Sequence, residues 1–135
     1  MPFESRLPGS SFDWLRRARS DLALAKMPLP DGALYEDLCF HAQQAAEKAI
    51  KSVYRSEGCE FRYTHDLGEL LDGLSRYGVA VPEKVREAVD LTDFAWQARY
   101  PGPAEPVSSV EYRRAVGLAE TVVDWATKIV EIGPA

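Results

Sequence analysis

The stretch that decides the fold runs from Leu34 to Arg55 and reads LYEDLCFHAQQAAEKAIKSVYR. Neither glycine nor proline interrupts it, and most of its residues keep their side-chain freedom in a helix. Its apolar residues recur every three or four positions in two adjacent rows: Leu34, Leu38, Ala42, Ala45, Ala49 and Val53, then Tyr35, Cys39, Ala46 and Ile50. A face this wide predicts a helix that packs against several neighbours.

Phe40 departs from the pattern because it falls on the polar side of this helix, among Gln43, Gln44, Glu47 and Lys51. An aromatic side chain in that position fits an interaction surface. It fits equally well a local packing contact with a loop. The sequence leaves both interpretations open.

The same helical spacing recurs along the rest of the chain, after a loose arm of residues 1–9. We expect helices over about residues 11–27, 34–57, 66–77, 82–96 and 109–132. Capping boxes are predicted at Ser10 with Asp13 and at Ser108 with Glu111, and Thr64 or Asp66 is expected to cap the third helix. No strand pattern competes, so periodicity alone predicts one all-α domain over residues 1–135.

The third and fourth predicted helices are the less regular ones. Gly73 weakens the third helix, which we expect to be short. In the fourth helix the residues expected to face inward are Val85, Ala88, Val89 and Ala95. The segment that follows, residues 97–107, contains three prolines and a glycine and is expected to be a loop.

Composition narrows the function. Hydrophobic residues make up 46% and charged residues 27% of the 135 residues, as in ordinary globular proteins. The net charge of −5 provides no global positive field for nucleic acid, so binding would need a local basic patch. No apolar run approaches a membrane span of about 18 residues, and the first residues lack the apolar core of a signal peptide. We expect a cytoplasmic protein in which Cys39 and Cys59 stay reduced.

The segment from Cys39 to Lys51 also resembles the central helix of HEPN domains (higher eukaryote and prokaryote nucleotide-binding). The resemblance covers roughly residues 10–132 and includes further matches: Trp14, Ala18, Asp21, Leu22, His65-Asp66-Leu67, Leu70-Leu71 and Arg99-Tyr100-Pro101. It implies the topology of a five-helix up-and-down bundle. It also implies a homodimer and, for chains of this size, a pairing with a separate minimal nucleotidyltransferase.

Where members of this family are enzymes, the resemblance implies metal-independent RNA cleavage by an Arg followed, four to six residues later, by a His. The imidazole would exchange a proton and the guanidinium would stabilise phosphate charge. The chain has two histidines, His41 and His65, and neither follows an Arg at that spacing. No zinc-type cluster or glycine-rich phosphate loop is present either, so we predict no catalytic residue, metal or cofactor.

The candidate ligand-binding residues lie in the long loop and on the central helix. Arg99 can bind phosphate and Tyr100 can stack on a base, although Arg99 could instead pair with a carboxylate and fix the loop. The loop is expected to fold over exposed and edge positions of the central helix and form a polar cleft lined by His41, Gln44, Lys48 and Lys51. His41 could instead pack at a helix interface, and His65 is expected to cap or pack.

Three functions follow from these features. The leading interpretation is a non-catalytic nucleotide-binding or interaction module that works with a nucleotidyltransferase, as in a toxin–antitoxin pair. The alternatives are a ribonuclease toxin that cleaves RNA without metal, and a purely structural dimer.

Overall fold

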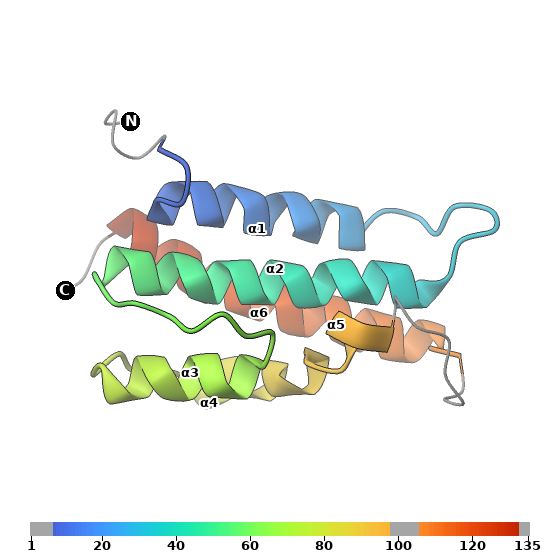
Figure 1. Ribbon diagram of the computed structural model, residues 1–135. Helices are drawn as coiled ribbons and strands as arrows, with labels where there is room; N and C mark the ends of the chain where they lie inside the picture. The colour runs from blue at the N-terminus through green and yellow to red at the C-terminus, as the bar shows by residue number, and fades with distance from the viewer. Residues whose placement is uncertain (1–6, 98–105, 133–135) are drawn as a thin grey trace.

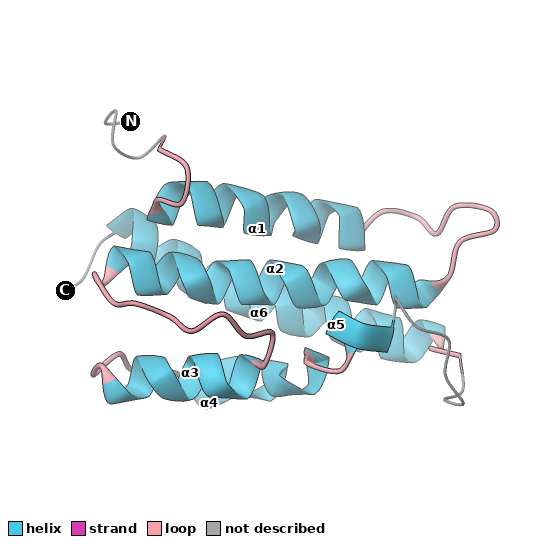
Figure 2. Cartoon of the chain, in the orientation of Figure 1, coloured by secondary structure: helices cyan, strands magenta, loops and turns pink. Residues whose placement is uncertain are grey.

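Three long helices form the centre of the molecule in a computed structural model that describes residues 7–97 and 106–132. They are α1 (Ser11–Ala25), α2 (Tyr35–Ser56) and α6 (Ser109–Ile132), and each packs against the other two (Figure 1). Helix α3 (Leu67–Arg76) and the short α4 (Glu83–Arg86) and α5 (Phe94–Gln97) complete the bundle. Figure 2 shows only helices and loops in the described part of the chain, which confirms the predicted all-α bundle.

The core lies around α2, whose alanines are fully buried. Ala42, Ala45, Ala46 and Ala49 have no exposed surface, and Ile50 and Val53 lie beside them. Small side chains let α1 and α6 approach the α2 backbone closely, and α6 contributes Ala119, Val122 and Ala126 to the same core. Leu34 does not join this row: it precedes the helix and is 60% exposed.

The helix starts follow the predicted caps. The Ser10 hydroxyl accepts a hydrogen bond from the Asp13 amide, and the Asp13 carboxylate reaches back to the Gly9 amide at 3.0 Å. This bond, with those from Arg16 and Arg17, outweighs burial and lowers the pKa of Asp13 to about 2. At α6, Ser108 and Glu111 form the reciprocal pair of a capping box. Asp66 caps α3 through the Glu69 amide.

The continuous helix predicted over residues 82–96 is wrong. Between α4 and α5 the chain forms a 3-10 helix, Glu87–Leu91, followed by a turn. The buried residues Val85, Ala88 and Leu91 are spaced by three, which matches the period of a 3-10 helix rather than that of an α-helix. Val89, expected inside, is therefore 40% exposed.

The turn after the 3-10 helix also contacts the N-terminus of α3. The Thr92 hydroxyl accepts a hydrogen bond from the Leu67 amide at 3.2 Å, at the first residue of α3. The break in the helix thus satisfies one of the amides that α3 leaves without an intrahelical partner.

A connector of residues 57–66 runs back along α2 before α3 begins (Figure 1). It brings α3 against the C-terminal half of α2, where the Tyr54 hydroxyl donates a 2.5 Å hydrogen bond to the Leu70 carbonyl. Gly73 makes this contact feasible, because a Cβ there would lie 2.1 Å from the Tyr54 hydroxyl oxygen. The glycine that weakens α3 locally is therefore needed for its packing.

We expect Gly73→Ala to destabilise the protein by about 1–3 kcal/mol, because the added methyl displaces the buried Tyr54 hydroxyl. Gly117→Ala in α6 is the matched control: its Cβ would meet nothing within 4 Å. A helical Gly→Ala change without a clash should stabilise by up to about 1 kcal/mol. Urea denaturation of both variants checks the difference in sign.

Tyr54→Phe should relieve part of the Gly73→Ala cost, since it removes the clashing oxygen and leaves the ring carbon 3.3 Å away. If Gly73→Ala were as stable as Gly117→Ala, the close contact between α2 and α3 would not require a glycine.

Candidate functional site

The polar residues predicted to form one cleft on α2 divide into two clusters. His41 and Lys48 face α1, whereas Lys51 faces the connector of residues 57–66. Gln44 lies between them and is half-buried, and its side-chain amide donates to the Gln43 oxygen at 2.7 Å. Arg99 and Tyr100 lie outside the described residues.

The first cluster, which we call the seam cluster, consists of Asp21 on α1 with His41 and Lys48 on α2. One carboxylate oxygen of Asp21 lies 2.9 Å from His41 Nδ1, and the other accepts a hydrogen bond from Lys48 Nζ at 2.6 Å. The side chain of Asp21 is 11% exposed, whereas those of His41 and Lys48 are 33% and 26% exposed. The buried carboxylate therefore holds two nitrogen-bearing side chains at the surface of the α1–α2 seam.

The prediction that Lys51 lines an exposed position is wrong, because Lys51 belongs to a second, buried cluster. Lys51 is buried, and its ammonium group lies 2.9 Å from the Glu47 carboxylate, which is 3% exposed. The same ammonium lies over the rings of Trp14 and Phe61, at 5.4 and 5.2 Å from their centroids. The polar row of α2 points inward here because the connector and the N-terminal turn of α1 cover it.

Glu47 is the centre of this cluster, which we call the Glu47 cluster. Besides Lys51, it accepts a hydrogen bond from the buried Gln43 at 3.0 Å, and its Oε1 lies 2.8 Å from His65 Nδ1. Burial alone would raise the pKa of Glu47, but the bonds from Lys51, Gln43 and His65 outweigh it, so the pKa lies below its ordinary value. The carboxylate is thus ionised inside the protein, and His65 packs against it.

The described residues on either side of residues 98–105 contact α2. Before it, α5 packs against α2. After it, the Val107 amide donates a 2.7 Å hydrogen bond to Glu36 in the first turn of α2. Phe40, one turn further along, is half-buried, and its ring lies 5.6 Å from that of His41 in an edge-to-face arrangement.

These groups limit the chemistry of the site. Nδ1 of His41 is engaged by Asp21, so the imidazole can exchange protons or donate hydrogen bonds through Nε2. Cys39 is a poor nucleophile because burial and the charges of Glu36 and Glu111 raise its pKa to about 12. Among the described residues, no group of His, Cys, Asp or Glu side chains is arranged to hold a metal ion. No helix in the part described has the length and apolarity needed to span a membrane.

The sequence interpretation missed the acidic partners of both clusters. The sequence contains a sign of the Asp21 contact, because Asp21 lies on the same face of α1 as Ala18 and Ala25. A carboxylate on an apolar face needs a cation or hydrogen-bond donor from a neighbouring helix. Glu47 carried a weaker sign: it lies at i+4 from Gln43 and at i−4 from Lys51. Only the path of the connector shows that this row is covered.

The chain is similar to known proteins of one family. A family model described as HEPN domain matches residues 12–130. A crystal structure of an archaeal HEPN homologue superposes with a TM-score of 0.72 at 25% identity, over 90% of this chain and 98% of that one. A HEPN domain protein from Thermotoga maritima matches at 28% identity over 90% and 88% of the two chains, with a TM-score of 0.43. No curated protein matches.

We expect Glu47→Gln to destabilise the protein at neutral pH by about 3–5 kcal/mol, since it leaves the buried Lys51 ammonium without its carboxylate. Glu131→Gln is the control. It disrupts only the surface pair with Arg19, whose two side chains are 48% and 46% exposed, and should cost about 0–1 kcal/mol.

The difference in stability between the wild type and Glu47→Gln should depend on pH. A carboxyl whose folded pKa is depressed stabilises the protein fully above its unfolded pKa, and the stabilisation is lost as the pH falls through the folded pKa. Urea midpoints measured from neutral to acidic pH should therefore fall more steeply for the wild type than for Glu47→Gln. Parallel curves would show that Glu47 is not ionised in the folded protein.

Proposed function

The chain belongs to the HEPN domain family, and we propose that this protein is a non-catalytic nucleotide-binding or interaction module that works with a separate nucleotidyltransferase. The observation that carries the proposal is the seam cluster. His41 and Lys48 present partly exposed nitrogen donors at the surface of one helix pair, as an anionic ligand requires. The missing Arg–His spacing and the net charge of −5 support binding rather than RNA cleavage.

In this proposal the loop of residues 98–105 completes the site. Its flanks are held at α2 by α5 and by the bond from Val107 to Glu36. Arg99 would add a guanidinium for phosphate and Tyr100 a ring for a base. The seam cluster, with Gln44 beside it, would bind the rest of the polar ligand. Lys51 is not part of this site, because its ammonium is buried against Glu47 beneath Trp14 and Phe61.

The proposal predicts that titration calorimetry detects binding of a nucleoside triphosphate or of the partner transferase. Arg99→Ala should weaken binding by about ten- to a hundredfold, the effect of losing a charge-assisted hydrogen bond. Lys48→Ala should also weaken binding. Lys128→Ala, an exposed lysine on α6, is the matched control and should leave affinity unchanged.

Two other results would contradict this proposal. If Arg99→Ala kept full affinity but lowered the melting temperature, Arg99 would fix the loop by pairing with a carboxylate. If neither nucleotides nor the transferase changed the melting temperature of the wild type, the chain would be a purely structural dimer.

The ribonuclease alternative is favoured by one specific observation. Asp21 engages His41 Nδ1, an arrangement that fixes the imidazole and leaves Nε2 for proton transfer. The discriminating assay incubates the purified protein with transfer or messenger RNA in the presence of a chelator. We expect no turnover; cleavage that His41→Ala abolishes would establish the enzyme and contradict the binding module.

The proposed assembly is a homodimer. Phe40 is half-buried near the start of α2, one turn after Glu36, which accepts the bond from Val107, and an aromatic there suits burial across a two-fold axis. Light scattering at micromolar concentration should give about twice the 15.0 kDa mass of the chain, and Phe40→Ala should shift the protein toward monomer. A wild type that stays monomeric at high concentration would contradict the dimer.

A further inference from the structure

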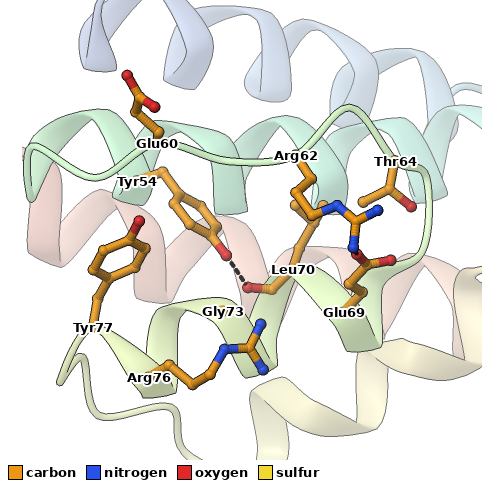
Figure 3. A pocket seen from close by; sticks show the side chains of 9 residues that line it. All are labelled: Tyr54, Glu60, Arg62, Thr64, Glu69, Leu70, Gly73, Arg76 and Tyr77. Carbon is orange, nitrogen blue, oxygen red and sulfur yellow. Dashed lines mark hydrogen bonds and ion pairs between the residues drawn. The ribbon is translucent and has the colours of Figure 1, made fainter.

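A pocket of about 280 Å³ lies between the connector of residues 57–66 and α3. It is separate from the seam cluster, because none of the three seam residues lines it and it opens toward α3, whereas His41 and Lys48 face α1. Side chains from α2, the connector and α3 converge on it (Figure 3). Its volume is close to the lower limit for small-molecule sites.

The floor of the pocket is built by Gly73 and Tyr54. Because Gly73 has no Cβ, the Tyr54 hydroxyl reaches the α3 backbone and donates to the Leu70 carbonyl (Figure 3). The hydroxyl oxygen keeps a lone pair that can accept a further hydrogen bond. A polar, rigid floor therefore lies beneath an opening that any larger residue at position 73 would narrow.

Two arginines enter the pocket from opposite sides, Arg62 from the connector and Arg76 from α3 (Figure 3). Within the described residues, the side chain of Arg76 makes no hydrogen bond or ion pair. It lies near the floor, since its Nη2 is 3.8 Å from the position of a Gly73 Cβ. Its charge also acts against the burial that raises the pKa of Tyr54. Arg76 thus offers an uncompensated guanidinium to an anion.

The acidic residues of the lining do not cancel this charge. Glu69 is paired with Arg62 at 2.7 Å through one guanidinium nitrogen, which leaves the other N–H groups of Arg62 available. The Glu60 carboxylate points away from the other lining side chains (Figure 3). The four charged side chains of the lining sum to zero, but with Glu60 directed away, Arg62, Arg76 and Glu69 together leave one positive charge facing the pocket.

An aromatic ring borders the same opening. Tyr77 is 57% exposed, and its ring lies beside Tyr54, with the two centroids 6.3 Å apart in an edge-to-face arrangement. An exposed tyrosine face and a guanidinium in the lining of one pocket together suit a planar ring attached to a phosphate.

We propose that this pocket binds a phosphate monoester attached to a planar ring, with the phosphate between Arg62 and Arg76 and the ring against Tyr77. The site does not depend on the seam cluster or on the loop of residues 98–105. Two kinds of ligand share this chemistry, a mononucleotide and an aryl phosphate, and the experiment separates them.

The test titrates adenosine monophosphate, phenyl phosphate, ribose 5-phosphate and adenosine into the purified full chain by calorimetry. We expect at least one of the first two to bind, and ribose 5-phosphate and adenosine to bind at least tenfold more weakly. Arg76→Ala should weaken binding by about ten- to a hundredfold, and Arg76→Lys, which keeps the charge but loses the fork, by less.

Arg113→Ala is the matched control, because Arg113 is an exposed arginine on α6 remote from the pocket lining. This variant should bind like the wild type. Amide chemical shifts of Gly73 and Tyr77 should move on titration. The proposal is overturned if neither ring phosphate binds, if Arg76→Ala binds normally, or if the shifts cluster at His41 instead.

Discussion

Most of the fold depends on the contacts of one buried, ionised carboxylate, that of Glu47. Glu47 is only 3% exposed, and polar contacts with Lys51, Gln43 and His65 stabilise its charge. A buried charge without such partners would cost several kcal/mol. The free-energy cost of burying this charge is offset only when His65 lies against α2 and when Trp14 and Phe61 cover the Lys51 ammonium. One charge thereby fixes the position of α1, the connector and the start of α3.

Asp21 has a comparable role on the other side of α2, with a different consequence. It is less buried, and its two cationic or titratable partners remain partly exposed. In the Glu47 cluster the lysine is buried and only His65 meets solvent, whereas in the seam cluster both the lysine and the histidine are partly exposed and can exchange solvent for a ligand. The same pattern of a carboxylate with a histidine and a lysine thus gives a structural element in one place and a candidate site in the other.

The sequence predicted what depends on local periodicity and capping. The wide apolar face of α2, the capping box of Ser108 and Glu111 and the cap at Asp66 are all properties of neighbouring residues, and the structure contains each of them. The break after Leu91 was not predictable in that way, since it depends on Thr92 reaching the Leu67 amide 25 positions away. The burial of Lys51 was missed for the same reason, because a remote segment covers it.

The connector has its length fixed by the chemistry along it. Phe61 packs beneath Lys51 and Arg55, and His65 reaches Glu47, whereas Tyr63 between them faces outward and is 96% exposed. Although it has no regular secondary structure, this segment has an inner and an outer side. An insertion between Phe61 and His65 would pull one of the two inward residues out of place. In evolution this loop should therefore accept substitutions at its outward positions while conserving its residue count, unlike most surface loops.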